Sequence, residues 1–463
     1  MASRDIIWIT LESVRQDHTS LDGHDRDTTP TLQRLAERAD GASFPNCFSH
    51  GIWTRTSSAS MLTGRAPAAH GVLSFDSKLP ESVETIPEQL SDNGYRTACV
   101  SPIGQVSEAT GLDRGFDDFH YLSRGTLLEE AGPLTMLRFL RNIRHHSAGL
   151  TTDTSKHSTG YLVTELAKRH IHRAGDGNDP LFLYTHIADS HHTYYPPKGW
   201  QETFAADLEL PLDEALTVAV EMSDALIENI ADGAQFTDAE WNAIEVLYDT
   251  CIRYVDHLVG EIVETAQAHL EDPLVVITAD HGELFGERGC LAHMLVANTA
   301  VSNVPLVIAG IDGLEGNENL VQHADALQLV LEECNLSIPV PAGTDMRDSK
   351  RTAAITQRGG KRAQKKLRQI QQHNPAFDTS LFHRNDLTSV RTATHRYQYS
   401  QDREELFELP DEVTDRATEQ PEVTDQLRRL TEEWLAEHGE PVETEQAEFS
   451  EQMQQQLEDL GYL

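Results

Sequence analysis

A run of hydroxyl side chains is the feature of this chain best suited to chemistry. Seven consecutive positions hold five hydroxyls, at Thr54, Thr56, Ser57, Ser58 and Ser60. The apolar turn at 59–62 predicts the start of a helix, and a helix N-terminus binds anions through its free N–H groups and its dipole. A hydroxyl at such a position can attack an anionic ester once another group lowers its pKa. Taken alone, the run is more typical of a helix cap, so an activating group must be sought elsewhere.

Acids and histidines that follow predicted strands supply candidates for that group. Glu12 follows the apolar run 6–11, with Asp17 and His18 nearby, and Asp280 and His281 follow the run 274–278. Glu12 and Asp280 are carboxylates and His281 is an imidazole, which are ligands suited to a divalent cation. The cation would lie beside Thr54, lower the pKa of its hydroxyl and neutralise the ester anion. The sequence therefore predicts a metal site of Glu12, Thr54, Asp280 and His281, although Glu12 by itself is also typical of a helix cap.

Three further side chains are candidates for handling the ester. His191 stands beside His192 after the apolar run 181–186, and His293 lies downstream of His281. His191 and His293 can bind the non-bridging oxygens or protonate the leaving group. Arg55 can hold the anion through its guanidinium. The alternatives are a packing or surface role for the histidines and a solvated position for Arg55.

Alternating strands and helices must bring these residues together. Buried strands are predicted at 6–11, 96–101, 181–186, 274–278 and 304–308, and helices at 31–39, 85–93, 160–172 and 238–270. This alternation is typical of an α/β fold with a doubly wound, mostly parallel sheet and helices on both faces. Ligands bind at the carboxyl ends of the strands in such sheets, which is where the candidate residues stand.

A change of pattern near residue 340 predicts a second unit. We expect a catalytic domain over 1–340, with an acidic, irregular surface insertion at about 202–236. Short strand-like runs at 351–356, 388–393, 397–399 and 405–409 precede a helix at 422–438, so 341–438 is predicted to be a small antiparallel α+β subdomain. The basic segment 361–372 is expected to be an exposed loop or helix, and 439–463 an acidic, Gln- and Glu-rich tail.

Composition excludes several classes of partner. The 463 residues include 75 acidic and 37 basic side chains, for a net charge of −38. The acids are spread along the chain, which argues against binding to nucleic acid or to anionic membranes. An acidic surface keeps a protein soluble where salt screens repulsion, so we expect a salt-loving source, such as a halophilic archaeon. Five scattered cysteines, no signal peptide and no membrane span predict a cytoplasmic protein of undetermined oligomeric state.

Several motifs in fixed order resemble the sulfatase family of the alkaline phosphatase superfamily. The resemblance rests on the opening strand with its acid (9–18), the TPxLxxLA helix (27–36), ASMLTGR (59–65), TADHGE (278–283) and Val304-Pro-Leu306. It continues through 390–397 and 405–409, so it covers nearly the whole chain. It implies an alkaline-phosphatase-like fold, one divalent metal (Ca²⁺, Mn²⁺, Mg²⁺ or Zn²⁺) and an anionic ester substrate, with a sulfated or phosphorylated glycan as one candidate.

The nucleophile segment departs from that family. Sulfatases carry a Cys or Ser that is oxidised to formylglycine, and the alignment on Ala59 and Ser60 puts Thr54 at that position. No formylglycine is expected at Thr54, since Thr does not yield it by that route. Relatives in the superfamily that act as phosphodiesterases, phosphomutases and phosphoethanolamine transferases use a Thr nucleophile. Thr56 and Ser58 replace the Pro and Arg of the signature, and His281 stands where phosphonate monoester hydrolases have His.

Three functions remain open at this level. The first is a metal-dependent hydrolase of sulfate or phosphate mono- or diesters that works through a covalent intermediate on Thr54. The second is a transferase that passes the same group to a glycan or lipid hydroxyl. The third is a non-catalytic relative that acts as a binding or scaffold protein, because a fold does not fix a function.

Overall fold

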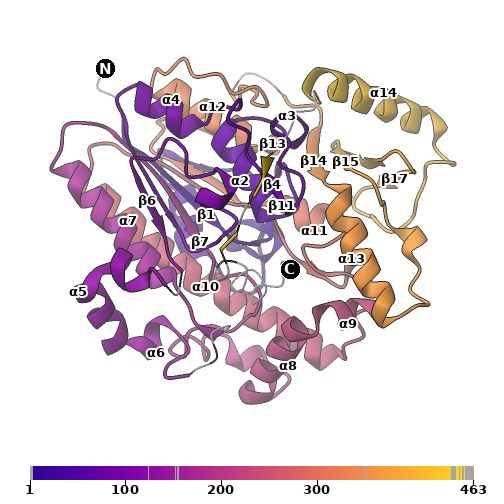
Figure 1. Ribbon diagram of the computed structural model, residues 1–463, viewed down its shortest axis with the longest axis horizontal. Coiled ribbons are helices and arrows are strands. Elements are labelled where there is room, and N and C mark those ends of the chain that lie inside the picture. The colour runs from indigo at the N-terminus through magenta and orange to yellow at the C-terminus, as the bar shows by residue number, and fades with distance from the viewer. Residues whose placement is uncertain are drawn as a thin grey trace.

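A seven-stranded sheet forms the centre of the molecule (Figure 1). The computed structural model describes residues 4–123, 125–151, 153, 156–347, 350–439, 445–447, 449–450 and 453. The strand order is β2-β12-β8-β1-β7-β5-β6. The strands are β1 (Ile6–Leu11), β2 (Gly41–Ser43), β5 (Arg96–Ser101), β6 (Asp118–Tyr121), β7 (Leu181–Ile187), β8 (Leu274–Ala279) and β12 (Leu306–Ala309).

The register of the sheet aligns the ends of its central strands. The neighbours β8, β1, β7, β5 and β6 are parallel, and β1 pairs Leu11 with Ile187 of β7 and with Ala279 of β8. The three central strands β1, β7 and β8 are fully buried, as their continuous apolar runs predict. The last residues of three adjacent strands therefore lie side by side. β12 runs antiparallel to β8, and β2 antiparallel to β12.

Helices cover both faces of the sheet, which confirms the predicted α/β class. In Figure 1 α7 and α10 lie on one face and α2, α4 and α12 on the other. On the first face are α7 (Gly160–Gly175) and α10 (Asp238–His269), and α1 (Pro30–Ala36) contacts α10. On the second face are α2 (Thr54–Thr63), α4 (Ile86–Asp92) and α12 (His323–Glu333). Capping boxes at Thr85 and Thr237 fix the starts of α4 and α10.

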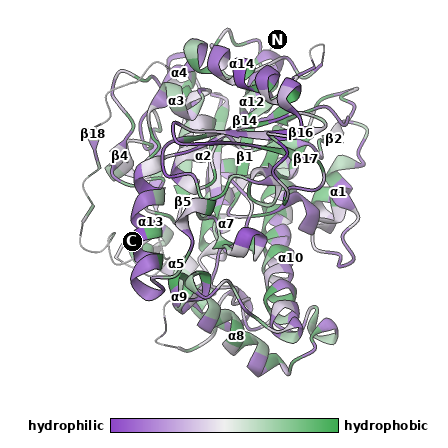
Figure 2. Cartoon of the chain, turned by 90° about the vertical axis from the view of Figure 1, so that its right-hand side faces the viewer, coloured by the Kyte–Doolittle hydropathy of each residue, from purple (hydrophilic) through white to green (hydrophobic). Residues whose placement is uncertain are grey.

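The C-terminal antiparallel unit is also present. Its sheet has the order β14-β15-β16-β17, with β14 (Ala354–Arg358), β15 (Leu387–Arg391), β16 (His395–Tyr399) and β17 (Glu404–Glu408). The helix α14 (Pro421–His438) packs on it through Leu427. The basic segment is an amphipathic helix, α13 (Gly360–His373), which Figure 2 shows as mostly hydrophilic.

Two predicted elements differ from the structure. The segment 202–236 is not irregular, since it contains α8 (Leu212–Asp224) and α9 (Leu226–Ala231). Ala215, Ala219 and Met222 of α8 are buried, so a one-sided apolar face made of small residues hid this helix. The predicted strand 304–308 is interrupted at Pro305, which has no N–H to donate, and divides into β11 (Asn303–Val304) and β12.

Short elements complete the described chain. They include β3 (Cys47–Phe48), β4 (Ser77–Lys78), β9 (Leu284–Phe285), β10 (Leu291–Ala292), β13 (Val321–Gln322), α3 (Pro67–His70), α5 (Leu127–Arg141), α6 (Ile143–His146) and α11 (Thr299–Ser302). Glu445–Gln446 forms β18, which pairs with β4. Most of the predicted tail 439–463 lies outside the described residues. None of the described helices combines the length and apolar character of a membrane span.

Candidate active site

The predicted metal ligands meet at the carboxyl edge of the sheet. Glu12 directly follows β1, and Asp280 and His281 directly follow β8, its neighbour. Thr54 is the first residue of α2, so its hydroxyl lies at the positive end of that helix. All four side chains are fully buried. The structure therefore brings together the set that the sequence singled out.

Short contacts join the four side chains. Thr54 Oγ1 donates a hydrogen bond of 2.5 Å to Glu12 Oε1 and lies 3.4 Å from His281 Nε2. His281 Nε2 lies 3.3 Å from Asp280 Oδ2 and 3.7 Å from Glu12 Oε1. Ser57, the alternative nucleophile, instead donates to the carbonyl of Gly51. Thr54 is thus the hydroxyl of the run that faces the acids.

His186 is a member of the cluster that the sequence analysis missed. It is the sixth residue of β7, and its Nε2 lies 2.6 Å from Glu12 Oε2 and 4.0 Å from Asp280 Oδ2. One ligand atom each of Glu12, His186 and Asp280 lie within 4.8 Å of one another. The available signal was a histidine near the end of a buried strand. The sequence analysis counted that histidine as part of the strand and not as a candidate ligand.

Electrostatics favour a cation at this cluster. Burial, together with the nearby charge of Glu12, raises the pKa of Asp280 to about 6. Burial lowers the pKa of His281, but Asp280 and Glu12 outweigh it and raise that pKa to about 9. Burial also raises the pKa of Glu12, which its bonds to His186 and His281 more than offset. The two buried carboxylates thus depend on protonated histidines for positive charge. A bound metal ion would supply that charge in place of the protons on the histidines.

The donor set fits a divalent metal. Asp280 Oδ1 accepts hydrogen bonds from the backbone N–H groups of Ser13 (3.0 Å) and His281 (2.9 Å), which fixes the carboxylate in place. Its Oδ2 is buried and accepts no hydrogen bond within the described chain. His281 Nδ1 lies 2.8 Å from the carbonyl of Gly282, a bond that orients Nε2 toward the oxygens. Oriented imidazole and carboxylate ligands of this kind are typical of metal sites.

A second group of histidines lies beside the ligand cluster. The ring of His293 lies 4.4 Å from that of His281 and 5.3 Å from that of His191, and His192 lies 4.1 Å from His191. Burial lowers the pKa of His191 and His293, which favours their neutral forms. The structure therefore places His191 and His293 beside the cluster, and their roles toward the ester stay predictions.

Arg55 is not part of this group. Its guanidinium donates 2.7 Å to Gln105 Oε1, 3.1 Å to the carbonyl of Ser77 and also to the carbonyl of Phe75. It is buried against the ring of Trp53. These contacts hold the Arg55 side chain beside Gln105, Ser77 and Phe75 at the start of α2. Its role in holding the substrate anion stays a prediction. Adjacent helix residues point about 100° apart, so Thr54 and Arg55 face different surroundings.

Two cations of α13 approach the site from the C-terminal unit. Burial lowers the pKa of Lys366 to about 7, and its charge acts on His192. Arg362 packs over the ring of Trp53 at 4.5 Å, and its charge acts on His293. The sequence showed α13 only as a basic segment, because nothing in a charge run tells which of its residues turn inward.

Comparisons with known proteins indicate the family and the fold of the chain. A family model described as Sulfatase matches residues 4–332. Choline-sulfatase of Rhizobium meliloti (strain 1021) is 25% identical over 302 residues, which cover 61% of this chain and 57% of that protein. The match thus spans less than two thirds of the relative's length.

Two solved structures share the fold along nearly the whole chain. The phosphonate monoester hydrolase of Agrobacterium radiobacter has a TM-score of 0.68 at 19% identity, over 95% of this chain and 96% of its own. A protein solved with its substrate D-glucosamine-2-N,6-O-disulfate has a TM-score of 0.66 at 16% identity, over 95% and 99%. The likeness confirms the alkaline-phosphatase-like fold.

Proposed function

We propose that this chain, which belongs to the sulfatase family, is a metal-dependent hydrolase of sulfate or phosphate esters with Thr54 as its nucleophile. The observation that carries the proposal is the contact of Thr54 Oγ1 with Glu12 at 2.5 Å and with His281 at 3.4 Å, at the N-terminus of α2. A hydroxyl so placed has a proton acceptor beside it and a helix dipole that favours an anion.

The proposed ligand set is Glu12, Asp280 and His281 with Thr54 itself. His186 bonds Glu12 from β7, and its ligand atom lies within 4.8 Å of those of Glu12 and Asp280. A bound divalent cation would lower the pKa of the Thr54 hydroxyl and offset the negative charge of the ester. Carboxylate and imidazole donors suit Mn²⁺, Ca²⁺, Mg²⁺ or Zn²⁺, so the identity of the metal is part of the test.

Two displacements account for the reaction. In the first, Thr54 passes its proton to Glu12, a bond forms from Oγ1 to sulfur or phosphorus, and the bond to the alcohol oxygen breaks. That oxygen takes a proton from the imidazolium form of His191 or His293, which the nearby ester anion would favour against the effect of burial. In the second, water attacks the covalent intermediate and returns a proton to the histidines, and Thr54 leaves with the proton held by Glu12. The products are the alcohol and sulfate or phosphate.

A substrate screen with two variants tests the proposal. The metal-free protein is reloaded with each cation and assayed on aryl sulfates, phosphate monoesters, phosphodiesters and phosphonate esters in molar salt. We expect turnover with at least one cation and at least about a 10³-fold loss of kcat/KM in Thr54→Ala. Ser57→Ala is the matched control and should stay within about threefold, because the Ser57 hydroxyl donates to the backbone carbonyl of Gly51 and not to the acids. Absence of turnover with every cation, or unchanged turnover in Thr54→Ala, contradicts the proposal.

A further inference from the structure

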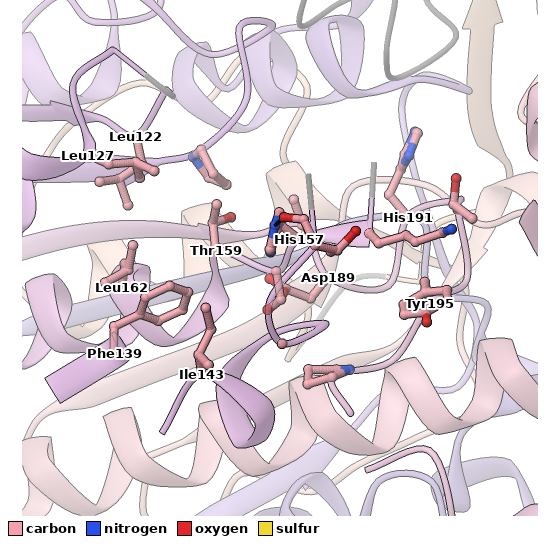
Figure 3. A pocket seen from close by; sticks show the side chains of 18 of the residues that line it. Leu122, Leu127, Phe139, Ile143, His157, Thr159, Leu162, Asp189, His191 and Tyr195 are labelled. Carbon is pink, nitrogen blue, oxygen red and sulfur yellow. Dashed lines mark hydrogen bonds between the residues drawn. The ribbon is translucent and has the colours of Figure 1, made fainter. Parts of the chain in front are cut away.

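An apolar pocket adjoins the histidine side of the site. It has a volume of about 430 Å³, within the range of roughly 300–1,000 Å³ that small-molecule sites occupy. Its walls come from α5, α6, the start of α7 and the loops after β5, β6 and β7. Figure 3 shows Leu122, Leu127, Phe139, Ile143 and Leu162 on one side, and His157, Asp189, His191 and Tyr195 on the other.

The polar end of the pocket connects with the proposed reaction centre. His191 and His192 belong to both, and the ring of His191 lies 5.3 Å from that of His293. Under the proposed function, these histidines face the oxygen that leaves with the alcohol. The group attached to that oxygen would therefore extend away from Thr54, toward the leucines of the pocket.

The surface around the pocket is apolar as well. Among the described residues, seven large hydrophobic side chains are more than half exposed, and five of them lie between residues 128 and 150. Two of the five, Leu140 and Leu150, also line the pocket, so its apolar wall continues to the surface. Exposed apolar side chains that gather in one patch mark a binding region, whereas singly scattered ones are ordinary.

We propose that this pocket holds an alkyl chain and that the substrate is an amphiphile, a long-chain alkyl ester of sulfate or phosphate. The inference rests on the proposed function, which it deepens by naming the alcohol part of the substrate. An aliphatic wall offers no partners for the hydroxyl groups of a sugar, and burying hydroxyls without partners is unfavourable. The aliphatic side of the pocket thus favours an alkyl alcohol over the glycan considered from the sequence, while its polar residues lie toward the end at His191.

A chain-length series tests the inference. Butyl, octyl and dodecyl esters of sulfate and phosphate are assayed below their micelle concentrations, so that single molecules are compared. We expect kcat/KM to rise about fourfold for each methylene group buried, until the pocket is filled. A flat series, or faster turnover of sulfated sugars than of dodecyl esters, overturns the proposal.

Two exposed leucines on one helix give matched variants. Leu140 lines the pocket and Leu137, one turn earlier on α5, does not, and both are more than half exposed. Leu140→Asp should lower kcat/KM for the dodecyl ester at least tenfold and leave the butyl ester within twofold. Leu137→Asp should change neither. Equal losses in the two variants would assign the effect to the outer surface and overturn the pocket assignment.

Binding without turnover separates this inference from the proposed function. Calorimetry of dodecyl phosphonate with the Thr54→Ala protein should show binding at least tenfold tighter than that of butyl phosphonate, and Leu140→Asp should abolish the difference. Turnover of short esters with no chain-length effect on binding leaves the proposed function intact and overturns the inference. Chain-length-dependent binding without turnover of any ester supports the alkyl-chain pocket and overturns the proposed function.

Discussion

At the scale of single residues, the site is a set of oxygens and imidazoles held in one buried volume. Thr54, Glu12, Asp280 and His281 come from sequence positions up to 269 residues apart, and their contacts range from 2.5 to 3.7 Å. These four were predictable because each follows a recognisable strand or starts a recognisable helix. The contacts of Arg55 with Gln105, Ser77 and Phe75 could not be predicted, because the direction in which a side chain leaves a helix depends on the packing around it.

His186 carries a residue-scale prediction. We expect His186→Ala to weaken binding of Mn²⁺ about 10- to 100-fold, because it removes the bond of 2.6 Å that orients Glu12. Calorimetric titration of the metal-free protein measures this. His323→Ala is the control, since the Nε2 of that buried histidine lies 2.9 Å from the backbone carbonyl of Ala279 and the ring is not in the proposed ligand set. An unchanged dissociation constant in His186→Ala would remove His186 from the metal site.

At the scale of elements, most strands and helices could be predicted from the sequence. The helix α8 and the inward side chains of α13 could not. The strand 96–101 and the helix 238–270 agree with β5 and α10 nearly residue for residue, because caps and apolar patterns mark both. α8 escaped prediction because its buried face consists largely of alanine. The inward cations of α13 escaped it too, since their burial depends on a C-terminal unit that packs on the site from far along the chain.

The joint between β17 and the catalytic domain gives an element-scale prediction. Glu405 is buried and bonds His383 Nε2 and Arg288 Nη2, each at 2.9 Å, and Arg403 at 2.6 Å. Burial raises its pKa, but these partners outweigh burial and hold the pKa at about 2, below its ordinary 4.5. The folded state therefore gains stability above pH 4.5 and loses it as the pH falls toward 2.

We expect Glu405→Gln to lower the free energy of unfolding by about 2–4 kcal/mol at pH 7 and by almost nothing near pH 2. Chemical denaturation at several pH values measures the difference. Glu408→Gln, an exposed position on the same strand, should change the free energy by less than about 0.5 kcal/mol. A cost in Glu405→Gln that stays the same at low pH would show that charge is not its source.

At the scale of the whole molecule, the net charge of −38 is the dominant property. Repulsion among the surface acids opposes folding, and salt screens it. We expect the melting temperature to rise steadily between 0.1 and about 3 M KCl. Differential scanning calorimetry over that series measures it, and a maximum in dilute buffer would contradict a salt-loving protein.

Properties of the whole chain are harder to predict from the sequence than the site is. The division at residue 340, the cytoplasmic location and the salt-loving source stay predictions. The five cysteines are all free and buried, so they form no disulfide within the chain. Composition constrains such whole-molecule properties only broadly, whereas the site depends on a few contacts that the fold sets.

The central claim is that Thr54 forms a covalent bond to the group it cleaves. Acid-quenched reaction mixtures of the metal-loaded protein with a turned-over ester, digested and analysed by peptide mass spectrometry, test it most directly. We predict one sulfuryl or phosphoryl group on Thr54 during turnover, and none in Thr54→Ala or once the substrate is exhausted. Turnover with the group on Ser57 or Ser58, or turnover that persists in Thr54→Ala, would contradict the account.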